Sequence, residues 1–201
     1  MVSTGVFWAL DDTKSPNLRH KNRLSWQSKL SYVYSVTDEI NVSAGVGYSS
    51  WKLGYEKDFF WGSGMSVGDE QYNLDELLLP LSMSWQPGVL FLKAGLTPRF
   101  LNKMEQRHKF FRSSSNWIYR DERDNYQSIN LSADLAVGMQ FRLGSNWRLA
   151  VDSELWQCLF ADTQYSLFGV FKDKKVYRKG LGANLSVRYI IKVKNTLRTL
   201  G

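Results

Sequence analysis

Apolar and polar residues alternate along most of this 201-residue chain. The clearest segment runs from Ser128 to Leu143, where every odd position from Ile129 onward is apolar and every even position is polar or small. An α-helix, with a period near 3.6 residues, cannot sort its side chains in this way, whereas a β-strand between two different environments does. The pattern therefore predicts a strand with one apolar face.

Seven further segments show the same alternation with less regularity. They cover residues 2–10, 24–36, 40–48, 76–85, 90–100, 147–155 and 181–193. The first is the weakest, because only Val6 and Trp8 mark its apolar face. Together with residues 128–143 they predict eight strands.

The segments between these strands alternate in length. Thr37–Glu39, Gln86–Gly88 and Gly144–Asn146 are short and rich in turn-forming residues. The other connections, residues 11–22, 56–73, 103–127 and 162–180, are long and polar. Short turns at one end and long loops at the other are typical of outer-membrane barrels. The expected fold is therefore all-β, an eight-stranded antiparallel up-and-down transmembrane β-barrel over residues 1–193, followed by a short tail at residues 194–201.

Composition favours a β-barrel over a helical membrane protein. Hydrophobic residues make up 43% of the chain and aromatic residues 14%, yet the mean hydropathy is −0.35. No apolar run approaches the roughly 18 residues that a transmembrane helix needs. The alternative all-β fold is a soluble, lipocalin-like barrel, in which the apolar face would line a cavity. The other face argues against it, because it carries Ser, Gly, Asn and Ala more than the Lys and Glu of a water-exposed surface.

Several strand segments resemble a known family. They are residues 40–48 (INVSAGVGY), 77–85 (LLLPLSMSW), 90–96 (LFLKAGL), 136–142 (AVGMQFR) and 181–190 (LGANLSVRYI). In these segments, and in Pro80 within the fourth strand, the chain resembles the outer-membrane β-barrel domain family common in Bacteroidetes and the small OmpA-type and OmpX-type barrels. The resemblance implies the outer membrane of a Gram-negative bacterium. The even number of predicted strands, with short turns on the periplasmic side, places both termini in the periplasm. The chain departs from the family at Lys192–Gly201, which continues past the terminal aromatic residue usual in such barrels.

The residues after Met1 lack the basic and apolar regions of a signal peptide. An outer-membrane protein must be exported. The chain is therefore expected to be either a mature form or the barrel module of a longer envelope-spanning signalling protein.

Charged residues on the polar faces of the strands would point into the barrel. Because an eight-stranded barrel is only wide enough to be filled by side chains, these charges must pair. The favoured interpretation is a structural ion-pair network, with a narrow ion path or gate as the alternative. Asp152 and Glu154 share one face, but their basic neighbours favour a structural pair over acid–base catalysis. The expected lumen network comprises Lys29, Glu76, Lys93, Arg99, Asp134, Arg142, Arg148, Asp152, Glu154, Arg188 and Lys192.

The long loops combine positive charge with aromatic residues, in a chain of net charge +7 and pI about 9.4. They predict contacts with outer-membrane lipid or lipopolysaccharide phosphates, or with a protein partner. Nucleic-acid binding is not expected, because the charges divide between lumen and loops instead of forming one basic face. The candidate contact residues are Phe59, Phe60, Trp61, Arg107, His108, Lys109, Phe110, Phe111 and Trp117.

No motif indicates an enzyme, a metal or a cofactor. Cys158 is the single cysteine, His20 and His108 lack metal-ligand spacing, and no GxSxG nucleophile motif occurs. The expectation is a non-enzymatic barrel with an anchoring, structural or recognition role at the cell surface. A small pore or a lipid-modifying outer-membrane enzyme remains the alternative.

Overall fold

The computed structural model describes residues 1–10, 18–21, 24–61, 64–109, 118–121, 128–160, 162–164 and 174–189. Among them there is no helix long and apolar enough to cross a membrane. The strands are β1 (Val2–Leu10), β2 (Leu18–Lys21), β3 (Leu24–Ser35), β4 (Ile40–Trp61), β5 (Gly64–Leu78), β6 (Leu81–Trp85), β7 (Leu90–Lys109), β8 (Ile118–Asp121), β9 (Ile129–Arg142), β10 (Trp147–Cys158), β11 (Asp162–Gln164), β12 (Lys174–Val176) and β13 (Lys179–Tyr189).

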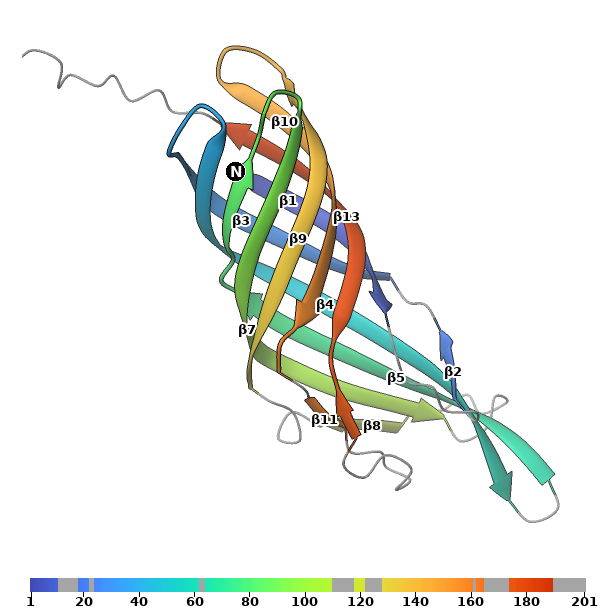
Figure 1. Cartoon of the computed structure of the whole chain (residues 1–201). Helices are drawn as coiled ribbons and strands as arrows, with labels where there is room; N and C mark the ends of the chain where they lie inside the picture. The colour runs from blue at the N-terminus through green and yellow to red at the C-terminus, as the bar shows by residue number, and fades with distance from the viewer. Residues whose placement is uncertain are drawn as a thin grey trace, which may run out of the picture.

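The sheet closes into an eight-stranded antiparallel barrel, which confirms the predicted fold class (Figure 1). β1, predicted with the weakest signal, pairs with β3 on one side and with β13 on the other. Its register with β13 runs from Val2 opposite Val187 to Leu10 opposite Lys179. The fourth barrel strand is made of β5 and β6, separated by Leu79 and Pro80. Pro80 has no N–H to donate, so the ladder is interrupted there, while its carbonyl oxygen still accepts from Gly45 N at 3.0 Å.

The three short turns lie where the sequence predicts them, between β3 and β4, between β6 and β7, and between β9 and β10. In the second of these turns Gly88 has φ of +121°, a backbone conformation that residues with a Cβ rarely adopt. Both termini of the described chain lie at this short-turn end (Figure 1).

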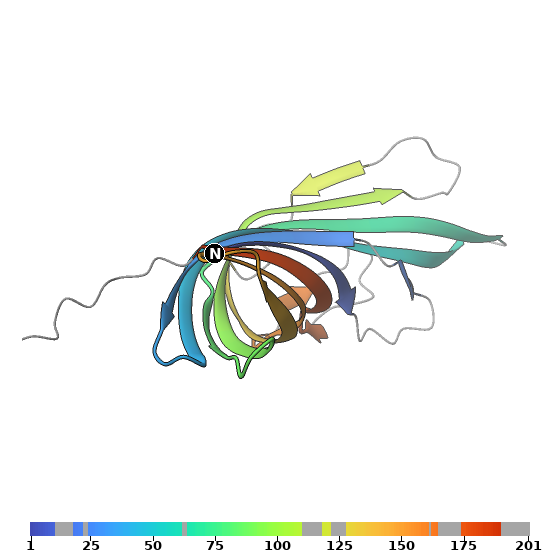
Figure 2. The ribbon, with the colours of Figure 1, turned by 90° about the horizontal axis from the view of Figure 1, so that it is seen from above.

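Two of the predicted loop boundaries are wrong. Residues 56–73 and 103–127 were expected to form loops, but β4 continues to Trp61, β5 begins at Gly64 and β7 continues to Lys109. These extensions pair with each other, and β2 and β8 add to their outer edges. The resulting five-stranded sheet, in the order β2-β4-β5-β7-β8, projects from one side of the barrel, and we call it the projecting sheet (Figure 2). Backbone pairing persists there although the apolar alternation that marks a strand has ended.

A β-bulge in β7 changes which residues face inward. Glu76 lies opposite Leu101 and Asp75 opposite Lys103, so Asn102 is an extra residue in β7. Before the bulge the odd positions Thr97, Arg99 and Leu101 are buried, whereas beyond it the even positions Met104 and Gln106 are buried.

The two faces of the barrel differ sharply in chemistry. In β9 the outward residues Leu135 and Val137 are 55% and 58% exposed, whereas the inward residues Asp134 and Ala136 are 7% and 3% exposed. The same contrast recurs around the barrel, with large apolar side chains outside and mainly polar, small or paired charged residues inside. The outward positions include Trp8, Trp26, Leu30, Tyr34, Val46, Leu81, Trp85, Leu92, Met139, Phe141, Val151, Leu155, Leu181, Leu185 and Tyr189.

Candidate functional site in the barrel lumen

Glu154 on β10 lies at the centre of the first group of charges inside the barrel. Its side chain is 1% exposed and accepts from Lys29 Nζ at 2.7 Å and from Lys93 Nζ at 3.4 Å. Gln27 Nε2 donates to the same carboxylate at 3.3 Å and Asn184 Nδ2 at 2.8 Å. The donors come from β3, β7 and β13, so this cluster ties opposite walls of the barrel together through one buried carboxylate.

Glu76 at the end of β5 is the centre of a second cluster. It is 0% exposed and pairs with Arg99 on β7 at 2.9 Å between Nη1 and Oε2. Arg178, which precedes β13, pairs with the other carboxylate oxygen, and Ser49 Oγ donates to Oε2 at 3.2 Å. Arg99 is itself 1% exposed and donates through Nε to Ser132 Oγ at 3.0 Å. Both charges of the buried pair thus have additional hydrogen-bond partners, which offset the cost of removing them from water.

Asp134 and Asp152 are buried carboxylates held by neutral donors. Thr97 and Ser132 donate to Asp134, the latter at 3.0 Å. Asn184 donates to Asp152 at 2.8 Å. Asn184 therefore bridges Asp152 and Glu154, and these two carboxylates form part of one hydrogen-bond network rather than an open catalytic pair.

An aromatic plug made of Phe7, Trp51 and Trp156 fills the lumen beside the Glu76 cluster. The rings of Trp51 and Trp156 are 4.4 Å apart at 71°, and Phe7 lies 6.2 Å from Trp51. The Arg99 guanidinium lies 3.9 Å from the centre of the Trp156 ring, a cation–π contact. Leu74, Leu101 and other buried apolar residues surround the plug.

The structure does not bring the expected lumen residues together into a single network. Lys29, Lys93 and Glu154 form one cluster, Glu76 and Arg99 belong to the other, and Asp134 and Asp152 are hydrogen-bonded nearby. Arg142, Arg148 and Arg188 lie apart from them, at the short-turn end. Lys192 lies outside the described residues.

Sequence reasoning missed two components of this interior. Arg178 was placed in a loop, and no pattern in the sequence shows that it reaches Glu76. The aromatic plug was also missed, although strand parity could have found it. Trp51 continues the inward odd positions of β4, and Trp156 continues the inward even positions of β10.

The candidate loop-contact residues lie mainly on the projecting sheet. Phe59, Phe60 and Trp61 end β4, and Arg107, His108 and Lys109 end β7. Arg107 Nε donates a hydrogen bond to Glu105 Oε1 at 2.8 Å, and this bond lowers the pKa of the Glu105 carboxyl. The Arg107 guanidinium lies 5.0 Å from the centre of the Tyr119 ring. Phe110, Phe111 and Trp117 lie outside the described residues. In the described part of the chain no group of His, Cys, Asp and Glu could hold a metal ion.

Comparisons with known proteins give only distant structural similarity. Neither protein-family models nor curated proteins match the chain. Among solved structures, the chain is similar to Ail, the attachment invasion locus protein of Yersinia pestis, with 15% identity, TM-score 0.33, and coverage of 92% of this chain and 95% of that one. It is also similar to the N-terminal β-barrel domain of Pseudomonas aeruginosa OprF, with 14% identity, TM-score 0.33, and coverage of 91% and 96%. Similarity at this level identifies neither a ligand nor a function.

Replacing Glu154 with Gln tests the first cluster. The E154Q substitution keeps the shape of the side chain but leaves Lys29 and Lys93 without their shared counter-charge. We expect it to lower the free energy of unfolding by about 3–5 kcal/mol, the usual cost of breaking a buried ion pair. Urea unfolding of the detergent-solubilised protein measures this. The control, D38N, alters an exposed turn carboxylate and should change stability by less than about 0.5 kcal/mol. Equal midpoints for the two variants would contradict the assignment.

Replacing Gly180 with Val tests the aromatic plug. Gly180 lies opposite Trp156 in the register of β10 and β13, and a Cβ there would lie 2.5 Å from Trp51 Cη2 and 2.8 Å from Trp156 Nε1. We expect G180V to destabilise the barrel by about 1–3 kcal/mol through overpacking and to shift tryptophan emission. The matched control is A183V on the outward face of the same strand. If G180V were as stable as A183V, the plug would not be tightly packed.

Proposed function

We propose that this protein is an integral outer-membrane β-barrel without a catalytic role, which anchors the projecting sheet at the cell surface for recognition. The observation that carries the proposal is the inverted arrangement of the two barrel faces. Large apolar side chains cover the outside, and the buried interior holds charges and hydrogen-bonding groups. A water-soluble barrel has polar side chains outside and apolar side chains inside. The apolar outer surface of this barrel therefore fits a lipid environment.

Strand length and aromatic placement agree with a membrane span. β9, β10 and β13 contain 14, 12 and 11 residues, and a tilted transmembrane strand needs roughly 9–11. Outward aromatic pairs lie near both ends of the barrel wall. Trp147 and Tyr189 are 4.8 Å apart near the short turns, and Trp26 and Tyr48 are 5.6 Å apart toward the other end. Such pairs fit the aromatic girdles at the two membrane surfaces.

The filled lumen favours an anchor over a pore. The Glu154 and Glu76 clusters and the aromatic plug occupy successive levels of the interior, and their central side chains are 0–1% exposed. To pass through the barrel, an ion would have to break the buried ion pairs of both Glu154 and Glu76, at a cost of several kcal/mol for each pair. The same filling supports the soluble barrel poorly, because a lipocalin-like carrier needs an apolar cavity.

The projecting sheet is the part available to a partner. By the usual orientation of such barrels, the short turns and both termini lie in the periplasm and the projecting sheet lies outside the cell. Ile118 and Tyr119 on β8 are 47% and 58% exposed, beside the Arg107–Glu105 pair. Exposed apolar and basic residues together fit a protein partner or lipopolysaccharide, while the outward barrel residues contact lipid.

Arginine substitutions at two depths test the membrane span. Leu135 lies in the middle of β9, Leu143 directly follows the short-turn end of this strand, and both are exposed. We expect L135R to cost about 2–4 kcal/mol of folding free energy in lipid vesicles and L143R about 0–1 kcal/mol. The folded fraction can be read from the altered gel migration of unheated samples. Equal and negligible effects of the two substitutions would overturn the proposed membrane placement.

Epitope insertion tests the orientation. One epitope is inserted between Trp61 and Gly64, where the paired strands β4 and β5 of the projecting sheet meet in the sequence, and a matched one in the turn between β9 and β10. In cells that export the barrel, an antibody added to intact cells should label the first and not the second. Labelling of only the second would place the projecting sheet in the periplasm and remove the proposed surface role.

A further inference from the structure

Three arginines stand side by side at the short-turn end of the lumen. In the sheet register Arg148 on β10 lies opposite Arg142 on β9 and also opposite Arg188 on β13. All three occupy the inward positions of their strands. Like charges directly opposite each other destabilise a sheet, so this row is unfavourable unless something compensates it.

In the part of the chain that the structure describes, no carboxylate compensates the positive charge of this row. Among the described residues, none of the three arginines has a carboxylate within ion-pair distance. This contrasts with Glu154 and Glu76, each of which is paired with two cations. The buried Nε of Arg188 has no hydrogen-bond partner in the same described set.

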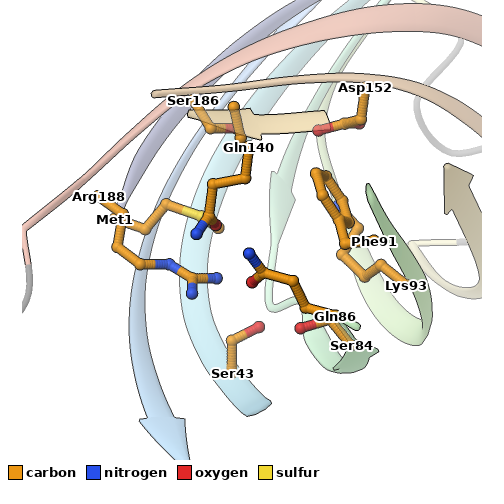
Figure 3. Close-up of a pocket in the computed structure, with 11 residues that line it drawn as sticks. Met1, Ser43, Ser84, Gln86, Phe91, Lys93, Gln140, Asp152, Ser186 and Arg188 are labelled. Atoms are coloured by element: carbon orange, nitrogen blue, oxygen red, sulfur yellow. The ribbon is translucent and has the colours of Figure 1, made fainter. Parts of the chain in front are cut away.

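Arg188 lines a small cavity of about 30 Å³ together with further unused donors (Figure 3). Gln140 is 8% exposed and Ser186 is 4% exposed, and neither side chain forms a hydrogen bond to another described residue. Ser84 lines the cavity as well. In Figure 3 the Arg188 guanidinium points into the space that Gln140 and Gln86 also face, while Asp152 lies across the cavity, where Asn184 holds it.

We propose that this cavity and the arginine row form a binding site for a single phosphate-class oxyanion. A guanidinium presents paired N–H donors that match the oxygens of such an anion, and hydroxyl and amide groups complete its hydrogen bonding. A space of this size holds only a few atoms, which favours one anionic group over a sugar or a nucleotide. Arg142 is exposed at the rim and provides positive potential along the entrance. The anion can be free phosphate or the phosphate of a lipid headgroup at the membrane edge.

The test measures thermal unfolding of the full chain in a nonionic detergent, with inorganic phosphate or with chloride at matched ionic strength. We expect phosphate, but not chloride, to raise the unfolding midpoint of the parent protein. R188Q and R148Q should each weaken the apparent phosphate affinity about tenfold or more, the effect of losing one charge-assisted hydrogen bond. In chloride, R148Q should unfold no lower than the parent, because it relieves repulsion in the row. The matched control R107Q, on the projecting sheet, should keep the full phosphate response.

A second arm separates the two sources of phosphate. Micelles that contain phosphatidylglycerol, without free phosphate, are compared with micelles that contain a neutral lipid. If inorganic phosphate raises the unfolding midpoint and R188Q abolishes the increase, the ligand is a free anion. If an Arg188-dependent increase occurs only with phosphatidylglycerol, the ligand is a lipid headgroup. If neither arm stabilises the parent beyond its control, or if R188Q and R148Q respond as fully as the parent, the site does not exist. This result leaves the membrane anchor untouched, since that proposal depends on the outer face.

Discussion

The pairing of β1 with β13 closes the sheet, and the remaining features of the molecule depend on that closure. An open sheet would expose the backbone N–H and C=O groups of two edge strands, whereas a barrel pairs them all within its wall. In hydrocarbon each unpaired group costs several kcal/mol, so closure is a condition of the proposed membrane placement. The nine-residue register from Val2–Val187 to Leu10–Lys179 meets this condition across the whole of β1.

Closure with eight strands also determines how the interior must be built. The lumen is only wide enough for side chains, so every charge inside must find a partner within a fixed and narrow space. Glu154 and Glu76 meet this requirement by pairing with two cations each. The aromatic plug packs beside the Glu76 cluster and adds one cation–π contact with Arg99. The arginine row at the short-turn end departs from this rule. The described buried carboxylates all have ion-pair or hydrogen-bond partners, and the lack of such partners for the arginine row within the described residues is the physical basis for assigning an anion site there.

The sequence predicts those parts of the fold that are governed by the contrast between two environments. Alternation located the barrel strands and their outward faces, and turn chemistry located the three short connections. The prediction failed where that contrast ends. Beyond the barrel β4 continues to Trp61 and β5 begins at Gly64, although the sequence there has no regular alternation of apolar and polar residues. The bulge at Asn102 and the reach of Arg178 to Glu76 depend on packing between distant segments, which no local pattern encodes.

In the proposed membrane placement, one face of each barrel strand meets lipid and the other faces a filled lumen. Spin labels placed one at a time on residues 133–141 of β9, in a Cys158→Ala background and in lipid bilayers, test this directly. We expect the rate of collision with oxygen, which dissolves in lipid, to oscillate with a period of two residues and to be greatest at Leu135, Val137 and Met139. We also expect these positions to be shielded from a water-soluble nickel reagent. Maxima at Asp134, Ala136 and Gly138, or strong nickel contact at the odd positions, would contradict it.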